Sequence, residues 1–181
     1  MRREESEDMS NALVSARRLF VGTAVISLLL DQVSKVLAHG LLHPYVPYPV
    51  LGQVLRFVLV SNQRGLFGMS YGPIWMHYAL PLLGMCLVVY FAWRSLSRWT
   101  SVAFGLILAG GLGNNLIDRV RLGSVIDFID FGFGKWRWYT FNLADAFVLV
   151  GVIMLIGYEF LGPKPGTVAP AAADPEPGKL S

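Results

Sequence analysis

Four carboxylates lie in a short stretch of this sequence with strongly apolar flanks, between residues 113 and 145. They are Asp118, Asp127, Asp130 and Asp145. Ionisable side chains at or near a bilayer are costly to desolvate, and they usually mark functional sites. Two aspartates that share one proton can do acid–base chemistry, because the ionised carboxylate activates water while the protonated one donates to a carbonyl oxygen. We therefore expect two of these residues to form a catalytic pair.

The surroundings of Asp118 favour a structural role for this residue. Asn115, Asp118 and Arg119 lie at positions i, i+3 and i+4, so one face of a helix carries all three side chains. This spacing predicts that Asp118 belongs to a structural ion pair. Arg119 could stabilise the charge of the catalytic pair or of a tetrahedral intermediate.

Three aspartates remain as candidates for the pair. Asp127 and Asp130 stand three residues apart in a repeated IDF motif, and the residues alone leave both open. Asp145 follows Asn142 by three residues and begins an apolar segment. At that place the positive end of a helix dipole favours the ionised form of its carboxylate.

The composition indicates an integral membrane protein. Of the 181 residues 54% are hydrophobic and only 15% are charged, whereas soluble domains carry about 25% charged residues. A net charge of +3, scattered along the chain, argues against a nucleic-acid binder. The single cysteine, Cys86, and the three histidines form no metal-ligand pattern, so we expect no metal.

Four apolar segments define the expected fold. Twenty residues at 1.5 Å each cover the roughly 30 Å of a hydrocarbon core. The segments run over residues 19–38, 74–93, 99–117 and 144–161, and the second could also begin at His77. No small-residue cleavage site follows the first segment, so it is expected to be a permanent span and not a signal peptide. The fold class is an all-α integral membrane protein, a bundle of four transmembrane helices.

The ends of the chain differ in composition from the membrane domain, which we place at residues 17–161. Residues 1–16 are mostly polar and are expected to form a disordered or loosely helical cytoplasmic tail. Residues 162–181 are rich in Pro, Ala and Gly, which predicts a disordered tail.

An even number of spans brings both termini to one side of the membrane. Arg94 and Arg98 lie in the short connection between the second and third spans, and such basic connections favour the cytoplasm. The polar clusters at the ends of the first and third spans and at the start of the fourth then meet at the outer face. In the first cluster Asp31 and Lys35 are four residues apart and can pair. They either snorkel to the interface or face the interior of the bundle.

The two connections on the outer side differ in character. Val54, Phe57 and Val60 are strand formers and the turn SNQRG follows them, which predicts a small extracytoplasmic β platform. Asn62 in that turn either caps the backbone or hydrogen-bonds a substrate. Residues 119–140 form a second outer loop with several aromatics. Its Trp136 and Trp138 either anchor the interface or line the lipid of a substrate.

Glycines gather in the second half of the third span. Gly105, Gly110, Gly111 and Gly113 favour close packing of helices over a phosphate-binding loop, because the pattern lacks a GxGxxG fingerprint and no strand precedes it.

Four motifs appear in order, each near the end or the start of a span: DQVSK (31–35), GNNLIDR (113–119), VIDF (125–128) and FNLAD (141–145). Together they resemble those of lipoprotein signal peptidase, the type II signal peptidase of bacteria, and the resemblance covers residues from about 19 to 161. It implies that Asp127 and Asp145 are the catalytic aspartates. The supporting polar residues that it implies are Asp31, Lys35, Asn62, Asn115, Arg119 and Asn142, and we add Asp118. We expect a structural role for Asp130.

The same resemblance implies the reaction and its setting. The expected enzyme is an intramembrane aspartic endopeptidase that cuts prolipoproteins just before the diacylglyceryl-modified cysteine and releases the signal peptide. It would work without a cofactor in the bacterial inner membrane, with its active site near the outer face, and be inhibited by globomycin. We expect a monomer surrounded by membrane lipids.

The chain departs from the family pattern at two places. Arg64 and Leu66 follow Asn62 where the family usually has glycine and a small residue, which weakens the assignment of Asn62. Asn114 precedes the motif asparagine where glycine is usual. Asn114 and Asn115 could therefore exchange roles, although the spacing to Asp118 favours Asn115.

Two non-enzymatic functions compete with this interpretation. A small transporter or proton-relay subunit would place aspartates along a path across the bilayer, but here the charged clusters lie near one face and the inner halves of the spans are apolar. A structural assembly factor with interfacial ion pairs is the second alternative, and cleavage would distinguish it from a protease.

Overall fold

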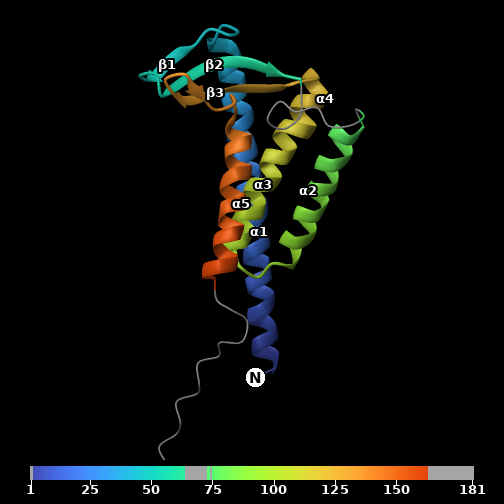
Figure 1. Ribbon diagram of the computed structural model, residues 1–181. Helices are drawn as coiled ribbons and strands as arrows, with labels where there is room; N and C mark the ends of the chain where they lie inside the picture. The colour runs from blue at the N-terminus through green and yellow to red at the C-terminus, as the bar shows by residue number, and fades with distance from the viewer. Residues whose placement is uncertain (1, 64–72, 74, 163–181) are drawn as a thin grey trace, which may run out of the picture.

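The computed structural model describes residues 2–63, 73 and 75–162. The expected disordered tail lies almost wholly outside the described residues, and so do Arg64 and Leu66. Long helices stand side by side and carry a small sheet at one end (Figure 1). The helices are α1 (Arg2–Leu41), α2 (Met76–Arg94), α3 (Arg98–Gly111) and α5 (Leu143–Leu161).

Two further helical segments follow α3 without a break. Residues Leu112–Asp118 form a π-helical segment, η2, and Arg119–Leu122 form α4. Among the described helices, three are long and apolar enough to cross a membrane: Glu4–Leu41, Arg98–Leu122 and Leu143–Leu161. The apolar part of α2, Tyr78–Arg94, is shorter.

The polar N-terminal segment, which was expected to be either disordered or loosely helical, is helical. It continues α1 without a break from Arg2 onwards. Its residues are mostly good helix formers, and Glu4 and Glu5 in the first turn complement the helix dipole. Of the two expected forms, disordered or loosely helical, the described residues therefore have the helical one.

Small residues allow α3 to pack between α1 and α5. A Cβ atom added at Gly105 would lie 2.8 Å from the carbonyl oxygen of Phe20 on α1. One added at Gly151 would lie 2.7 Å from the carbonyl oxygen of Ala103. Such distances leave no room for a side chain, so the predicted packing role of glycine is confirmed at Gly105, and Gly151 on α5 adds to it.

Four antiparallel strands form one sheet in the order β1-β2-β3-β4. The strands are β1 (Tyr48–Leu51), β2 (Leu55–Asn62), β3 (Val125–Phe133) and β4 (Trp136–Arg137). The expected platform is therefore present, but the second outer loop is not a separate loop. Its β-branched and aromatic residues form β3, which pairs with β2 so that Val60 faces Asp127.

Asp130 joins three parts of this sheet through two arginines. Its Oδ2 accepts hydrogen bonds from Nε and Nη2 of Arg56 at 2.8 and 2.5 Å, and its Oδ1 accepts one from Nε of Arg137 at 2.7 Å. Burial alone would raise the pKa of Asp130, but the hydrogen bonds from Arg137 and Arg56 outweigh it and hold the pKa below its ordinary value. These contacts fit the structural role that we expected.

The two ends of the bundle differ. The sheet and the short α4 lie at one end, whereas the N-terminus, the connection between α2 and α3 and the end of α5 lie at the other (Figure 1). The start of α1 and the end of α5 therefore lie at the same end of the bundle.

Candidate active site

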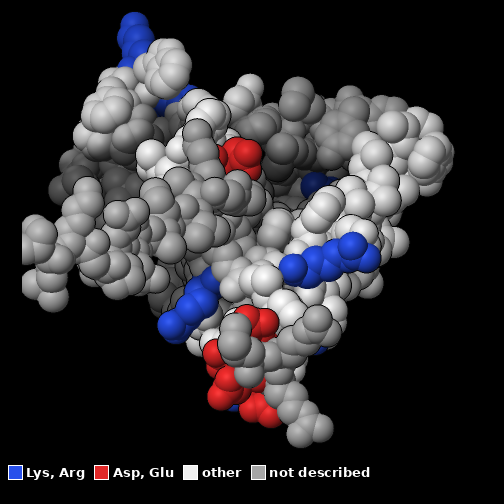
Figure 2. All heavy atoms as spheres, turned by 90° about the horizontal axis from the view of Figure 1, so that it is seen from below, with Lys and Arg blue, Asp and Glu red and all other residues white. Residues whose placement is uncertain are grey.

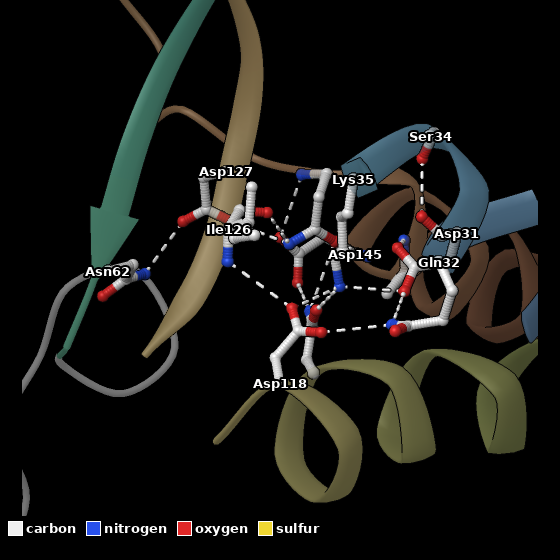
Figure 3. Close-up of polar contacts among 12 residues, drawn as sticks. Asp31, Gln32, Ser34, Lys35, Asn62, Asp118, Ile126, Asp127 and Asp145 are labelled. Carbon is white, nitrogen blue, oxygen red and sulfur yellow. Dashed lines mark hydrogen bonds and ion pairs between the residues drawn. The ribbon is translucent and has the colours of Figure 1, made fainter. Parts of the chain in front are cut away.

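A buried polar cluster lies where the helices meet the sheet. Its side chains come from α1, η2, β2, β3 and α5, and most of them point toward one another (Figure 3). Asp31, Lys35, Asp118, Asp127 and Asn142 are each at most 3% exposed. So many buried polar groups are tolerated only when they are hydrogen-bonded to one another.

Lys35 lies at the centre of the ionic part of the cluster. Its Nζ is 2.8 Å from Oδ2 of Asp31, 2.8 Å from Oδ2 of Asp118 and 2.6 Å from Oδ1 of Asn114. The predicted pair of Asp31 and Lys35 is thus confirmed, and it faces the interior instead of snorkelling to the interface. The predicted structural ion pair of Asp118 forms with Lys35. Arg119 begins α4 and is half-buried.

Gln32 belongs to this ionic group, although sequence reasoning missed it. Its Nε2 donates to Oδ2 of Asp31 and to Oδ1 of Asp118, both at 3.1 Å. One amide therefore links the two carboxylates that flank Lys35. The sequence feature that could have identified Gln32 is its place next to Asp31 in the DQVSK motif.

The π-helical segment brings Asn114, and not Asn115, into the cluster. Nδ2 of Asn114 donates to Oδ1 of Asp145 at 2.8 Å and to Oδ1 of Asn142 at 3.3 Å. The side chain of Asn115 turns back to the carbonyl oxygen of Gly111 at 3.3 Å. The sequence-based preference for Asn115 therefore does not match these contacts. A turn with i→i+5 bonds holds more residues than an α turn, which aligns Asn114 with Asp118.

Asp127 extends from β3 toward the start of α5. Its Oδ2 accepts a hydrogen bond from Nδ2 of Asn62 at 3.0 Å, and its Oδ1 accepts one from Nδ2 of Asn142 at 2.6 Å. Burial, followed by the nearby charge of Asp145, raises the pKa of Asp127 to about 7. At neutral pH this carboxyl is therefore divided between its protonated and ionised forms.

Asn142 and Asp145 form a capping box at the N-terminus of α5. Oδ1 of Asn142 accepts from the backbone N–H of Asp145 at 3.0 Å, and Oδ2 of Asp145 accepts from the N–H of Asn142 at 3.3 Å. Asp31 assists from α1, because its Oδ1 accepts from the N–H of Ala144 at 3.0 Å. Through its two amide atoms, Asn142 thus contacts both Asp127 and the turn that holds Asp145.

The cluster can do acid–base chemistry with carboxylates. Asp127 and Asp145 are linked through Asn142, and one of them titrates near neutral pH. Two such groups can share one proton between an acid and a base. In the described part of the chain, no three His, Cys, Asp or Glu side chains come together as a metal site.

Comparisons with known proteins agree with these motifs. The family model described as "Signal peptidase (SPase) II" matches residues 23–161. A lipoprotein signal peptidase of Mycobacterium avium is 38% identical over 157 residues, covering 79% of this chain and 82% of the relative. Another, of Polynucleobacter necessarius, is 37% identical over 142 residues, covering 76% of this chain and 86% of the relative.

Solved structures show the same fold. A bacterial membrane enzyme solved by the in meso method superposes with a TM-score of 0.71 at 28% identity, covering 78% of this chain and 87% of that one. A second structure of the same description gives a TM-score of 0.68 at 28% identity, covering 80% and 94%. The family match takes in all four polar motifs and most of the helical domain. The chain therefore belongs to the signal peptidase II family, a family of bacterial membrane proteases whose relatives here are lipoprotein signal peptidases.

Proposed function

We propose that the protein is an aspartic endopeptidase of the membrane that cuts prolipoproteins just before the lipid-modified cysteine. Asp127 and Asp145 are its catalytic residues. The observation that carries this proposal is the buried contact of Asn142 with both: its Nδ2 lies 2.6 Å from Oδ1 of Asp127, and its Oδ1 accepts from the N–H of Asp145. Family membership supplies the class of reaction.

The two aspartates have different roles in the proposed reaction. Asp145 is the base, because the N-terminus of α5 and Nδ2 of Asn114 favour its ionised form. It takes a proton from the attacking water. Asp127 is the acid, and its raised pKa keeps a proton available for the oxygen of the scissile carbonyl. Asp31, Lys35, Asn62, Asn114, Asp118, Arg119 and Asn142 position the pair.

The proposed placement in the membrane follows from the two ends of the bundle. Helices α1, α3 with its extensions, and α5 are three spans, and α2 beside α3 is the fourth. Arg94 and Arg98 favour a cytoplasmic position for the end that holds the N-terminus and the end of α5. The sheet then lies at the outer face of the bacterial inner membrane.

The lipid of the substrate explains why the site lies at this level. A diacylglyceryl cysteine stays in the leaflet, since each buried methylene contributes about 0.8 kcal/mol. Its scissile bond is therefore held near the interface. Trp136 on β4 and Tyr45 in the turn before β1 are each 71% exposed, as expected of interfacial aromatics. We propose further that the enzyme acts as a monomer without a cofactor and is inhibited by globomycin.

Cleavage of a synthetic lipobox peptide tests the function directly. The purified full-length protein in detergent should cut a diacylglyceryl-modified peptide and release a product that ends just before the modified cysteine. The same peptide without lipid is the control and should be cut far more slowly, and globomycin should block cleavage. If the folded protein leaves the lipidated peptide intact, the proposal is wrong.

The pH dependence of cleavage tests the assignment of the acid. Because the pKa of Asp127 is raised to about 7, its carboxyl is protonated below that pH and ionised above it. An acid must carry its proton, so kcat/KM should fall about tenfold per pH unit above pH 7. The unfolding temperature, measured over the same range, is the control. A rate that rises through pH 7 would instead make Asp127 the base.

Replacement of the two adjacent asparagines tests the geometry of the π-helical segment. Asn114→Ala removes the hydrogen bond to Asp145 and the acceptor for Lys35, and it should lower kcat/KM by about 10²-fold. Asn115→Ala is the matched control and should change kcat/KM by less than about threefold, since among the described residues its side chain donates to the carbonyl oxygen of Gly111 and not to the polar cluster. Equal losses in the two variants would contradict this assignment.

A further inference from the structure

A cavity of about 510 Å³ opens at the end of the bundle opposite the sheet. It lies between the end of α2, the start of α3 and the end of α5, and it shares no residue with the polar cluster. Figure 2 views this end from below, with basic side chains on either side of the acidic tip of α1. The residues that matter for its chemistry are Phe91, Arg94, Ser97, Leu155, Tyr158 and Glu159.

The cavity carries one positive and one negative side chain that do not pair with each other. Arg94 ends α2, and its guanidinium carbon lies 4.7 Å from the centre of the Tyr90 ring. Glu159 lies in the last turn of α5 and is exposed. Among the described residues neither side chain forms a salt bridge. A carboxylate is unfavourable at the negative end of a helix dipole, so a cationic ligand would stabilise Glu159 there.

The start of α3 adds donors for an anion. Ser97 is its N-cap, and its Oγ accepts from the N–H of Thr100. The N–H groups of Arg98 and Trp99, which come before Thr100, have no partner within the helix. The hydroxyl groups of Ser95 and Thr100 hydrogen-bond to each other. Arg94 and these N–H groups are therefore the donors for a phosphate, while Phe91 and Leu155 give the cavity an apolar wall.

We propose that this cavity binds a phospholipid whose headgroup bears a primary amine, that is, a phosphatidylethanolamine. Its phosphate contacts Arg94 and the start of α3, its ammonium group donates to Glu159, and its acyl chains follow the apolar wall. Opposite charges in one cavity match a zwitterionic headgroup better than an anionic one. The inference goes beyond the proposed function and depends only on this end of the bundle reaching the headgroups of the membrane.

Native mass spectrometry of the full-length protein in detergent tests the proposal. Three lipids with the same acyl chains are titrated: phosphatidylethanolamine, phosphatidylcholine and phosphatidylglycerol. The variants are Arg94→Gln and Glu159→Gln, and Arg98→Gln is the matched control, because Arg98 is exposed on the same connection but does not line the cavity. The unfolding temperature in lipid-free detergent should match that of the wild type for all variants.

The expected result is a pattern across lipids and variants. The wild type should bind phosphatidylethanolamine about tenfold more tightly than phosphatidylcholine, since a quaternary ammonium donates no hydrogen bond to Glu159. Glu159→Gln should remove this preference, and Arg94→Gln should weaken binding of phosphatidylethanolamine about tenfold. Arg98→Gln should behave like the wild type. Equal binding of all three lipids, tighter binding of phosphatidylglycerol, or an equal loss in Arg98→Gln would overturn the proposal.

Discussion

Asp127→Asn and Asp145→Asn should each abolish cleavage of the lipidated peptide, with kcat lowered about 10³-fold or more. Asparagine keeps the shape of each side chain but neither donates an acidic proton nor takes one from water. Both variants should still fold and bind substrate, since an amide oxygen can accept most of the same hydrogen bonds. Single-turnover cleavage and the binding of an uncleavable lipopeptide measure the two effects separately.

Asp130→Asn is the matched control for these variants. Asp130 lies on the same strand as Asp127 but contacts Arg56 and Arg137 instead of the polar cluster. The change should lower the unfolding temperature, because two arginines lose their ionised partner, while the folded protein keeps its turnover. If Asp130→Asn abolished turnover and Asp127→Asn did not, the catalytic pair would contain Asp130 in place of Asp127.

Lys35→Met should destabilise the protein by about 3–5 kcal/mol. Lys35 is the cation between Asp31 and Asp118, and the side chains of all three are at most 4% exposed. Without it two buried carboxylates face each other with no compensating charge. Unfolding in detergent, followed by circular dichroism against temperature, measures the loss.

Two further variants show whether charge is the cause. Lys135→Met removes an exposed lysine from the turn between β3 and β4 and should change stability by less than about 0.5 kcal/mol. The triple variant Lys35→Met, Asp31→Asn, Asp118→Asn should recover much of the lost stability, because the uncompensated carboxylates are gone. A Lys35→Met protein as stable as the wild type would contradict the ionic role of this cluster.

Local spacing was sufficient to predict several contacts of the site. Asp31 and Lys35 pair because residues four apart share a face of an α-helix, and the order of the spans explains why three polar clusters meet at one end. Local spacing could not identify Asn114, instead of Asn115, as the asparagine that joins the polar cluster. The prediction assumed α-helical periodicity, whereas residues 112–118 form wider π-helical turns.

Long-range pairing accounts for most of what local sequence could not predict. The residues of β3 include two aspartates and a glycine, which suggested a loop, and they form a strand because β2 offers an antiparallel partner. The partners of Asp130 are likewise distant in sequence: Arg56 lies on β2 and Arg137 on β4. Gln32 was overlooked because an amide within an apolar segment has no distinctive spacing.

The pairing of β2 with β3 also determines when activity can appear during synthesis. β2 leaves the ribosome before α2 and α3, and β3 leaves after them. Asn62 and Asp127 therefore meet only once both intervening helices have been made, and Asn142 joins them later still. If Asp127 and Asp145 are the catalytic pair, as proposed, a nascent chain cannot cut its neighbours before α5 is made, because α5, the last helix of the described residues, supplies Asp145. Proteolysis would then begin only after α5 has been synthesised and has joined β2 and β3.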